Sequence, residues 1–501
     1  MIEHRISIMV IMCAVLAYVG YRWLERRASL QRIQAYKPVT DARPEMEAYL
    51  QKVFGTREIR KVTDNIYVTV NHGFSNVGII IAPEGLIIVD AMESLHTAAK
   101  TVLDIKKITS KQLKAIIYTH GHFDHIGGAK AFIDAYPDTN KTVEVWAHTQ
   151  YMQNVMFDLS IINKAMYRRG IRQFGPLLSD FDLNLPMFRN LSHRHGRGFV
   201  IPNRIVDKQE MKVNIAGMDL TLIHIPGETT DQLGIWLPKQ RVLFCGDDLY
   251  QTFPNLYTIR GSEFRSYLTW IESIDYMRSL KPEYLVFGHT TPMKGEAKIQ
   301  EVMTIYRDLI QFIHDQTIRF MNYGLHPEEI SPKLKMPKAL ETAPFLKEVY
   351  GNIPWSVKGL FHGYMGWFTG DPLDLTPLEP IEKAKRLVNL AGGPEAALNA
   401  AKKALDQNDF QWGLELSGSV VRLDPSHIEA KELKVKCLMK LANTQKSING
   451  YHYYMTTALE EMGEVSTDSP EMLRQEMMAM APIDTTFNLL KCRVKAEECG
   501  E

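Results

Sequence analysis

Residues 116–128 have the sequence IIYTHGHFDHIGG, an apolar, strand-like run that ends in three histidines and one aspartate. Alternate side chains of an extended segment point to the same side, so His120 and His122 can share one ion. Asp124 and His125 follow the bend and can reach a second ion, because imidazole and carboxylate groups both suit zinc-like metals. The stretch therefore predicts a metal site rather than a histidine-rich surface loop.

Strand and helix signals alternate around this motif. Residues 65–70 and 77–81 are strand-like, and after a Pro-Glu-Gly turn residues 86–90 continue as Leu-Ile-Ile-Val-Asp. A helix is expected from about residue 95 to 108, and this alternation predicts an α/β domain. The H-x-H-x-D-H motif in this setting resembles the signature of the metallo-β-lactamase superfamily. The resemblance implies an αββα sandwich, with Asp90 as structural support beside the site.

The resemblance also places the remaining metal ligands at the ends of later strands. A Pro-Gly turn at 226–227 is followed by Glu228, where most superfamily members have a histidine, so the charge of the site changes by one unit. Asp247 follows a strand where relatives place a bridging carboxylate, and His289 takes the usual position of the last histidine. The implied site holds two Zn²⁺ ions per chain, one bound by His120, His122 and Glu228 and one by Asp124, His125 and His289, with Asp247 between them.

Residues 249–261 indicate the class of substrate. Their sequence, LYQTFPNLYTIRG, contains the N-L-x-T-[LI]-R-G pattern of the bacterial-type alkyl sulfatases. Glu228 and Asp247 are 19 positions apart (247 minus 228), which is similar to the spacing of two glutamate ligands in those enzymes. The resemblance covers most of residues 50–460. It implies that Arg260 holds the sulfate of an amphiphilic sulfate ester, which is hydrolysed to an alcohol and inorganic sulfate.

Some positions depart from the family pattern. Asp247 and Asp248 stand where the family commonly has glutamate and asparagine. A shorter carboxylate can still bridge two ions, but the metal separation or the metal preference can differ. Phe174 stands where a tyrosine is usual, so Tyr167 and Tyr257 are candidates for any role of that tyrosine with the leaving group.

The chain becomes helical in composition after Lys294. Residues 297–322 have apolar side chains at helical spacing. Expected helices at 394–405, 409–423 and 425–441 alternate in a pattern like tetratricopeptide repeats. Parts of this region match the dimerisation segment of the alkyl sulfatases, and stacked helix pairs bury their faces against neighbours, so a homodimer is expected.

The length of the chain suggests roughly three folded domains. The sequence is divided into five predicted segments, some of them too short to be domains. They are an N-terminal membrane anchor (1–28), a stalk (29–54), a metallo-β-lactamase-like catalytic domain (55–300), an all-α, repeat-like domain resembling the alkyl sulfatase dimerisation domain (301–465), and a short tail resembling the start of a sterol-carrier-like domain (466–501).

The N-terminus carries an almost unbroken apolar run at residues 6–21, with Arg5 before it and further arginines after it. We expect a single-pass membrane protein because no small-residue cleavage site follows, although ~16 residues fall short of the ~20 that span a bilayer comfortably. A cleaved signal peptide or an ordinary helix are the alternatives. The basic flank favours a cytoplasmic catalytic part, whereas sequons at Asn140 and Asn190 favour the opposite side, so sidedness stays open.

The composition argues against some classes of function. Lysine plus arginine equals aspartate plus glutamate at 58 each, and no basic block is interleaved with aromatic residues, so no nucleic-acid partner is expected. The five cysteines are scattered without a C-x-x-C pair, which argues against a disulfide framework or a thiolate zinc finger.

The expected chemistry needs no catalytic side chain beyond a metal-bound water, since two zinc-like ions lower the pKa of that water toward neutrality. Arg260 is a planar fork of donors that can grip a sulfate bidentately. One alternative is a β-lactamase-like hydrolase of another ester, a thioester, a lactone or a phosphoester. Another is a membrane-anchored scaffold with an inherited metal site, against which the seven intact ligands argue.

Overall fold

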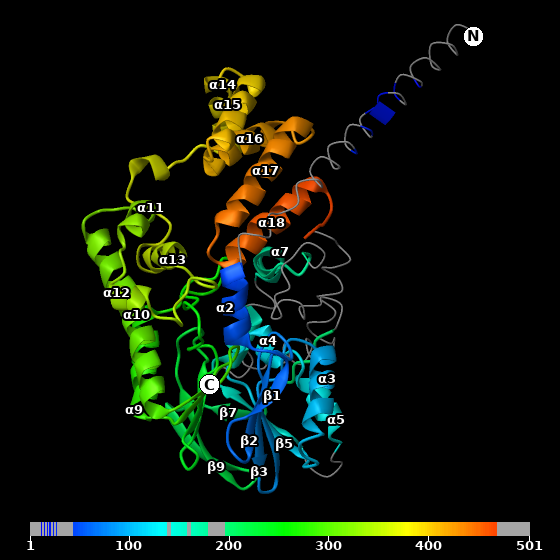
Figure 1. Cartoon of the computed structure of the whole chain (residues 1–501), viewed down its shortest axis with the longest axis vertical. Helices are drawn as coiled ribbons and strands as arrows, with labels where there is room; N and C mark the ends of the chain where they lie inside the picture. Colours follow the sequence, from blue (N-terminus) through cyan, green and yellow to red (C-terminus); the bar gives the residue numbers. More distant parts are fainter. Residues whose placement is uncertain are drawn as a thin grey trace, which may run out of the picture. The chain divides into compact units, whose positions relative to one another are not determined.

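The structure, a computed structural model, describes residues 44–137, 142–157, 162–178 and 196–467, together with isolated positions between 12 and 27. Within these residues the strands form two sheets that share a buried core, and helices cover their outer faces (Figure 1). The predicted αββα sandwich followed by a helical part is therefore confirmed.

The first sheet has the strand order β1-β2-β3-β4-β5-β6-β7 within the described residues. Neighbours from β1 to β4 pair antiparallel, whereas those from β4 to β7 pair parallel. The parallel strands bring their carboxyl ends to one edge, which is where the H-x-H-x-D-H motif follows β5. The strands are β1 (Glu58–Lys61), β2 (Ile66–Val70), β3 (Gly78–Ala82), β4 (Gly85–Val89), β5 (Leu113–Ile117), β6 (Glu144–His148) and β7 (Arg204–Val206).

The second sheet has the order β13-β12-β11-β10-β9-β8 among the residues described. All neighbours pair antiparallel except β11 and β12, which are parallel. The strands are β8 (Glu210–Ile215), β9 (Met218–His224), β10 (Leu233–Leu237), β11 (Val242–Phe244), β12 (Tyr284–Val286) and β13 (Met293–Lys294).

Alternation along the central strands divides their side chains between two cores. Ile87 and Ile117 join the core between the sheets, whereas Ile88 and Ile116 join the core beneath α3 and α5. Both faces of these strands are buried, which explains why β4 and β5 are nearly continuous apolar runs. Two rigid layers therefore carry the loops at the edge of the sandwich.

The helices α3 and α5 cover the first sheet, and α9, α10 and α13 contribute to a core that covers the outer face of the second (Figure 1). The helices of this part are α2 (Pro44–Phe54), α3 (Leu95–Ile105), α4 (Phe123–Ile126), α5 (Ala129–Ala135), α6 (Tyr151–Met156), α7 (Asn163–Phe174), α9 (Tyr267–Ser279), α10 (Glu296–Asn322), α11 (Pro327–Ile330), α12 (Lys338–Glu341) and α13 (Ile353–Met365), with short 3₁₀ turns η3 (Ser331–Lys333) and η4 (Pro372–Asp374).

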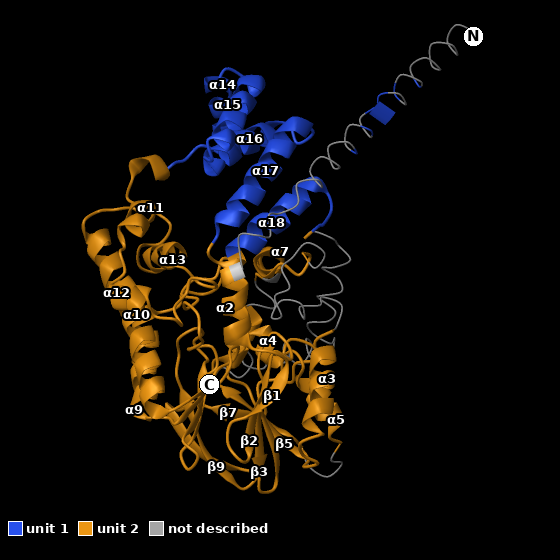
Figure 2. Ribbon diagram, viewed as in Figure 1, with its two compact units in different colours: residues 1–42, 376–445, 450–466 blue, residues 43–375, 446–449, 467–501 orange. Residues whose placement is uncertain are grey.

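The chain divides into two compact units, coloured in Figure 2. The larger unit contains residues 43–375 and 446–449, and therefore both sheets. The smaller one contains 376–445 and 450–466, where α16 packs against both α15 and α17 around a small apolar core. Its helices are α14 (Pro380–Leu390), α15 (Pro394–Asp406), α16 (Phe410–Leu423), α17 (Ile428–Thr444) and most of α18 (Ile448–Met462).

The prediction of a single-pass membrane anchor was wrong. Among the residues that the structure describes, no helix is long and apolar enough to cross a membrane. The apolar run that motivated the prediction was already shorter than the ~20 residues that cross a bilayer comfortably. Most of residues 1–28 lie outside the described residues, as does almost all of the predicted tail at 466–501.

Part of the predicted stalk is a packed helix. Residues 44–54 form α2, and its side chains Tyr49, Leu50, Val53 and Phe54 are buried. The Tyr49 hydroxyl donates to the Gln251 carbonyl at 2.6 Å. These last residues before β1 therefore belong to the larger unit.

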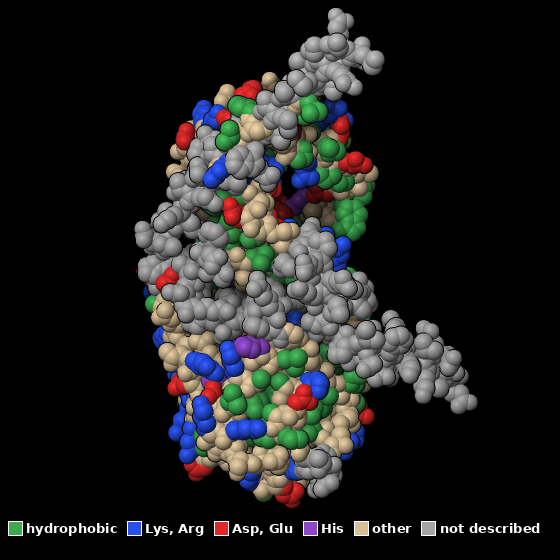
Figure 3. All heavy atoms as spheres, turned by 90° about the vertical axis from the view of Figure 1, so that its right-hand side faces the viewer, with side chains coloured by type: hydrophobic (Ala, Val, Ile, Leu, Met, Phe, Trp, Pro, Cys, Tyr) green, Lys and Arg blue, Asp and Glu red, His purple; other side chains and the backbone are tan. Residues whose placement is uncertain are grey.

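One face of the molecule is drawn in Figure 3. Basic and acidic side chains are interspersed on it, and apolar side chains gather over α3 and α5, where Leu103 is exposed. Such mixed charge is typical of a chain with equal numbers of acidic and basic residues.

Candidate metal centre

The H-x-H-x-D-H motif lies where β5 ends and the chain turns into α4. Strand β5 ends at Ile117, His120 follows it, and His122 occupies the N-cap position of α4 with extended backbone angles. Asp124 and His125 lie in the single turn of α4 and are buried. The bend between His122 and α4 therefore separates the motif into two pairs of side chains.

Three later loops bring further polar side chains to the same place. Glu228 follows β9, Asp247 follows β11, and His289 follows β12. Glycines precede all three because there is no room for a side chain: a Cβ at Gly227 would collide with Asp248, and one at Gly288 with Asp247. The three loops therefore pack closely against one another at these glycines.

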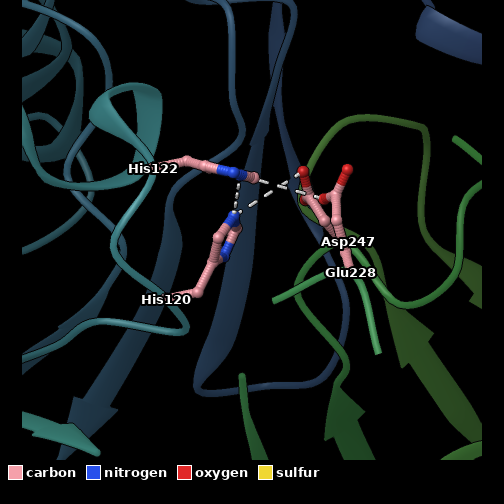
Figure 4. Close-up of side chains that lie close together, drawn as sticks. All are labelled: His120, His122, Glu228 and Asp247. Atoms are coloured by element: carbon pink, nitrogen blue, oxygen red, sulfur yellow. Dashed lines mark hydrogen bonds and ion pairs between the residues drawn. The ribbon is translucent and has the colours of Figure 1, made fainter. Parts of the chain in front are cut away.

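The first group of side chains consists of His120, His122, Glu228 and Asp247, whose nearest polar atoms lie within 4.8 Å of one another. Figure 4 shows the two imidazoles pointing toward the two carboxylates. His120 Nε2 lies 2.8 Å from His122 Nδ1 and 4.0 Å from Asp247 Oδ2. Glu228 Oε2 lies 4.0 Å from His122 Nδ1.

The second group consists of Asp124, His125 and His289. Asp124 Oδ2 lies 3.5 Å from the Nε2 atoms of both histidines. Asp247 belongs to the first group but also reaches this one, since its Oδ2 lies 2.8 Å from His289 Nε2 and 3.4 Å from His125 Nε2. The structure thus brings all seven predicted side chains together, with Asp247 between the two groups.

A further layer of partners fixes which nitrogen each histidine presents. Nδ1 of His125 contacts Asp90 Oδ2 at 2.7 Å, and Nδ1 of His289 contacts the Phe74 carbonyl at 2.9 Å. Nδ1 of His120 lies 3.0 Å from the Thr119 hydroxyl. All three rings therefore direct Nε2 into the site, which is the arrangement that second-layer partners impose on metal-binding histidines.

Several atoms of the cluster are buried without a hydrogen-bond partner among the described residues. They are His125 Nε2, Glu228 Oε2 and Asp247 Oδ1. Buried polar atoms normally find a partner, because an unsatisfied one is costly. A set of imidazole nitrogens and carboxylate oxygens with open lone pairs fits divalent metal ions of the zinc type.

The electrostatics of the cluster also suit cations. Burial lowers the pKa values of His120 and His122 well below the ordinary range, so both rings stay neutral, as a metal-binding imidazole must be. Burial alone would lower the pKa of His289, but Asp247 beside it raises that pKa to about 9. His289 and His125 in turn hold the pKa of Asp247 well below its usual range despite burial.

Arg260 lies beside the first group, with Nη2 3.0 Å from His122 Nε2. Its backbone N–H donates to Gln173 Oε1 at 2.7 Å, and the same oxygen accepts from the Thr258 hydroxyl at 2.9 Å. Gln173 is fully buried in α7. It was not predicted from the sequence, where nothing distinguishes it from a polar helix residue.

A second arginine is buried in the site and was also missed. Arg265 donates to Glu228 Oε1, and the Glu228 N–H donates to Asp248 Oδ1 at 2.9 Å. Burial raises the pKa of Glu228 to about 7, although Arg265 lowers it. A cavity of about 120 Å³ is lined by His122, Glu228, Arg265 and neighbouring residues, so this group is reached from a hollow in the protein.

The two tyrosines considered for a leaving-group role lie in other surroundings. Tyr167 packs with Ile171 on α7, and Tyr257 packs against Gly359 of α13. Phe174 instead contacts Phe74 edge to face, and Phe74 contacts His289 in the same way. An aromatic wall therefore borders the second group of ligand-type side chains.

Comparisons with known proteins match both parts of the chain. The metallo-β-lactamase superfamily model matches residues 70–289, and the alkyl sulfatase dimerisation model matches residues 326–464. A linear primary-alkylsulfatase from Pseudomonas sp. is 37% identical over 416 residues, which cover 82% of this chain and 78% of that protein. An alkyl/aryl-sulfatase from Saccharomyces cerevisiae is 31% identical, with 83% of this chain and 65% of that protein covered.

A solved structure gives the same fold. The chain superposes on a stereoselective inverting sec-alkylsulfatase from Pseudomonas sp. with a TM-score of 0.77 and 23% sequence identity. The superposition covers 92% of this chain and 82% of that one. The similarity therefore extends over both the sandwich and the helical part.

Proposed function

Because the chain belongs to the alkyl sulfatase family of the metallo-β-lactamase superfamily, we propose that it hydrolyses alkyl sulfate esters to an alcohol and inorganic sulfate. Similarity to the Pseudomonas primary-alkylsulfatase supports the reaction class. The observation that carries the proposal is the position of Arg260 beside His122, next to the seven ligand-type side chains. A cationic, fork-shaped donor next to a metal centre suits a sulfate ester better than a neutral ester.

The proposed metal centre holds two Zn²⁺ ions. His120, His122 and Glu228 bind one, Asp124, His125 and His289 bind the other, and Asp247 lies between them. The buried, unpartnered atoms of this set support that assignment. When bound, such ions supply Lewis acidity and make water a competent nucleophile near neutral pH, so no side chain needs to act as the general base.

Arg260 acts on the substrate. Its guanidinium binds two oxygens of the sulfate and stabilises the charge that develops as sulfate leaves. Gln173 keeps the Arg260 backbone in place, since Gln173 Oε1 accepts from both the Arg260 N–H and the Thr258 hydroxyl. Held in this way, the guanidinium stays beside His122 and the substrate is oriented toward the metal centre.

The enzyme acts as a homodimer in this proposal. The match of residues 326–464 to the alkyl sulfatase dimerisation model supports a second copy of the chain as partner. Nothing in this part of the proposal requires a membrane.

The test is sulfate release from a medium-chain alkyl sulfate by the purified chain, with wild type beside Arg260→Ala. Removing one charge-stabilising donor from an active site typically costs about 10²–10³-fold in rate, so a loss of this size is expected. A neutral carboxylate ester of the same chain length is the control substrate, and any activity on it should be unaffected by Arg260→Ala.

Two outcomes would contradict the proposal. Absence of sulfate release from metal-loaded wild type, with hydrolysis of the neutral ester, would instead indicate a hydrolase of another ester. Equal sulfate release by wild type and Arg260→Ala would remove the sulfate-binding role of this arginine.

A further inference from the structure

Ser75 and Asn76 lie in the connection between β2 and β3, and neither the sequence motifs nor the proposed reaction gives them a task. Both are buried, with exposed fractions of 1% and 4%. The connection is closed at its base, because the Val77 N–H donates to the Thr69 hydroxyl at 2.7 Å and the Thr69 N–H donates to the Val77 carbonyl at 3.0 Å. Its polar groups are therefore packed into the edge of the sandwich.

Asn76 is joined to the loop that carries His289. Its backbone N–H donates to the Gly288 carbonyl at 2.7 Å. Its side-chain Nδ2 donates to the Phe287 carbonyl at 3.1 Å and to the Thr290 carbonyl at 2.9 Å. These three hydrogen bonds therefore hold the backbone on both sides of His289.

A side-chain amide suits this position. Its NH₂ group has two hydrogens and can serve two carbonyl oxygens at once, whereas an ionised carboxylate in the same place has acceptors only. Phe287 and Thr290 are themselves buried, at 2% and 0% exposure. Removing the Asn76 amide therefore takes a donor away from two carbonyl groups in the interior, which is unfavourable and loosens the loop.

Ser75 is joined to a loop of the other sheet. Its hydroxyl donates to the Asp124 carbonyl at 2.5 Å. Asp124 follows β5 of the first sheet, whereas His289 follows β12 of the second. The preceding residue, Phe74, accepts from His289 Nδ1 at 2.9 Å through its carbonyl. Three consecutive residues therefore connect Asp124 to His289 across the edge of the sandwich.

The separation of Asp124 and His289 matters because both belong to the second group of ligand-type side chains. Asp124 Oδ2 lies 3.5 Å from His289 Nε2. Ligand atoms that share one metal ion must keep their distances to it within about 0.2 Å. Two side chains that arrive from different sheets meet this condition only if the loops that carry them are fixed to each other.

We propose that Ser75 and Asn76 are positioning residues of the second metal group: together they fix the separation of Asp124 and His289 at the value that a metal ion requires. The inference rests on the metal centre of the proposed function. It gives the connection between β2 and β3, which supplies none of the seven ligand-type side chains, a role in one of the two metal-binding events.

The test measures metal affinity without substrate. The full chain is stripped with a chelator, and its two Zn²⁺-binding events are followed by competition with a chromophoric chelator. His289→Ala, which removes a ligand, identifies the event that belongs to the second group. Loss of an outer partner of a metal ligand typically weakens binding by about 10–100-fold, so Asn76→Ala should weaken that event by this amount and leave the other nearly unchanged.

Ser75→Ala tests the same role from the other side of the connection. It removes the donor to the Asp124 carbonyl and should weaken the same binding event as Asn76→Ala. Circular dichroism verifies folding. Because Ser75→Ala removes only one hydroxyl, it carries the test if Asn76→Ala does not fold.

Asn352→Ala is the matched control. Asn352 is also a buried asparagine of the larger unit, and its side chain accepts from the Trp355 N–H at the start of α13. Loss of this cap should make the chain easier to unfold in urea. Both Zn²⁺ affinities should stay as in wild type, which separates a loss of stability from a loss of positioning.

Two results would overturn the inference: wild-type Zn²⁺ affinities in both Asn76→Ala and Ser75→Ala, or an equal weakening of both binding events, as a general loss of structure would give. Neither depends on turnover. A chain that shows the expected affinities but releases no sulfate would contradict the proposed reaction and leave the role of Ser75 and Asn76 intact.

Discussion

At the scale of single residues, the partners of the histidines determine which atoms can bind metal. Asp90 illustrates this. It has a positive φ of 61°, and it accepts from the Thr119 N–H at 2.7 Å through Oδ1 and from the Thr119 hydroxyl at 2.9 Å through Oδ2. Oδ2 also lies 2.7 Å from His125 Nδ1. One side chain therefore connects two parallel strand ends and orients a ligand-type histidine.

Asp90→Asn should weaken metal binding by the second group. Asparagine tolerates the positive φ, but one of its two terminal atoms is a donor and must face either the Thr119 N–H or the His125 Nδ1–H. Loss of such a partner costs about 10–100-fold in metal affinity. Competition with a chelator measures the change.

Asp104→Asn is the control for this prediction. Asp104 forms ion pairs with Lys107 and Arg57 in partly exposed positions, so its replacement should leave metal affinity unchanged. An equal loss in both variants would show that the effect of Asp90→Asn is not specific to the site.

The sequence indicated which side chains could meet at the metal centre, but not which hydrogen-bond partners position them. His120 and His122 follow from alternation along an extended segment, and the other ligand-type residues follow from strand ends that meet at one edge. Arg265 did not follow, because its contact with Glu228 spans 37 positions and depends on how the loop before α9 folds back. Gln173 was missed for the same reason, since its contact with Arg260 spans 87 positions.

At the scale of elements, two stacked histidines join the ends of strands from different sheets. His148 ends β6 and His224 ends β9, and their rings are nearly parallel with centroids 3.8 Å apart. Burial and, to a smaller extent, the charge of His224 lower the pKa of His148 to about 4. Protonating either ring would place a charge inside this stack.

The pH dependence of stability follows from this shift. Between pH 6.5 and 4 the unfolded chain binds a proton at His148 and the folded chain does not, so the free energy of unfolding falls as the pH drops. The contribution is fully present above pH 6.5 and amounts to at most about 3 kcal/mol, less where solvent screens the charge.

His148→Gln should therefore reduce the loss of stability between pH 7 and pH 4.5. Urea unfolding at the two pH values gives the difference for each protein. The exposed residue His96 provides the control, and His96→Gln should retain the wild-type pH dependence. An unchanged pH dependence in His148→Gln would exclude the stack as a source of acid sensitivity.

At the scale of the whole molecule, the end of α13 and the segment after it have unusually exposed apolar side chains. Met365 is 61% exposed, Trp367 65% and Leu373 80%. All three lie within the residues that match the alkyl sulfatase dimerisation model. Exposed apolar side chains that follow one another along a segment typically mark an interface, so we expect the second copy of the chain to cover them.

Trp367→Glu should shift the chain from dimer toward monomer, because a carboxylate would have to be buried in the interface. Light scattering across a concentration series measures the effect. Leu103→Glu is the control, since Leu103 is also exposed but lies on α3, outside the matched region. A wild type that is monomeric at all concentrations would contradict the expected dimer.

The predictions of domain architecture were correct where they rested on apolar patterns repeated over many residues, and wrong where they rested on one short run. The α/β sandwich and the helices of the second part follow from repeated apolar patterns, and α10 (Glu296–Asn322) begins one residue before the predicted helix. The membrane anchor was inferred from a single short run, and no described helix can cross a membrane. The five domain boundaries stay predictions.

In the proposed reaction, two metal ions held by the clustered side chains are required for alkyl sulfate hydrolysis. The most direct test is to add Zn²⁺ stepwise to the chelator-stripped chain and to follow sulfate release from a medium-chain alkyl sulfate. We expect no release without metal and a plateau at two Zn²⁺ ions per chain, with release abolished in Asp247→Ala. Full sulfate release by the metal-free chain, or by Asp247→Ala, would contradict the proposed requirement for metal.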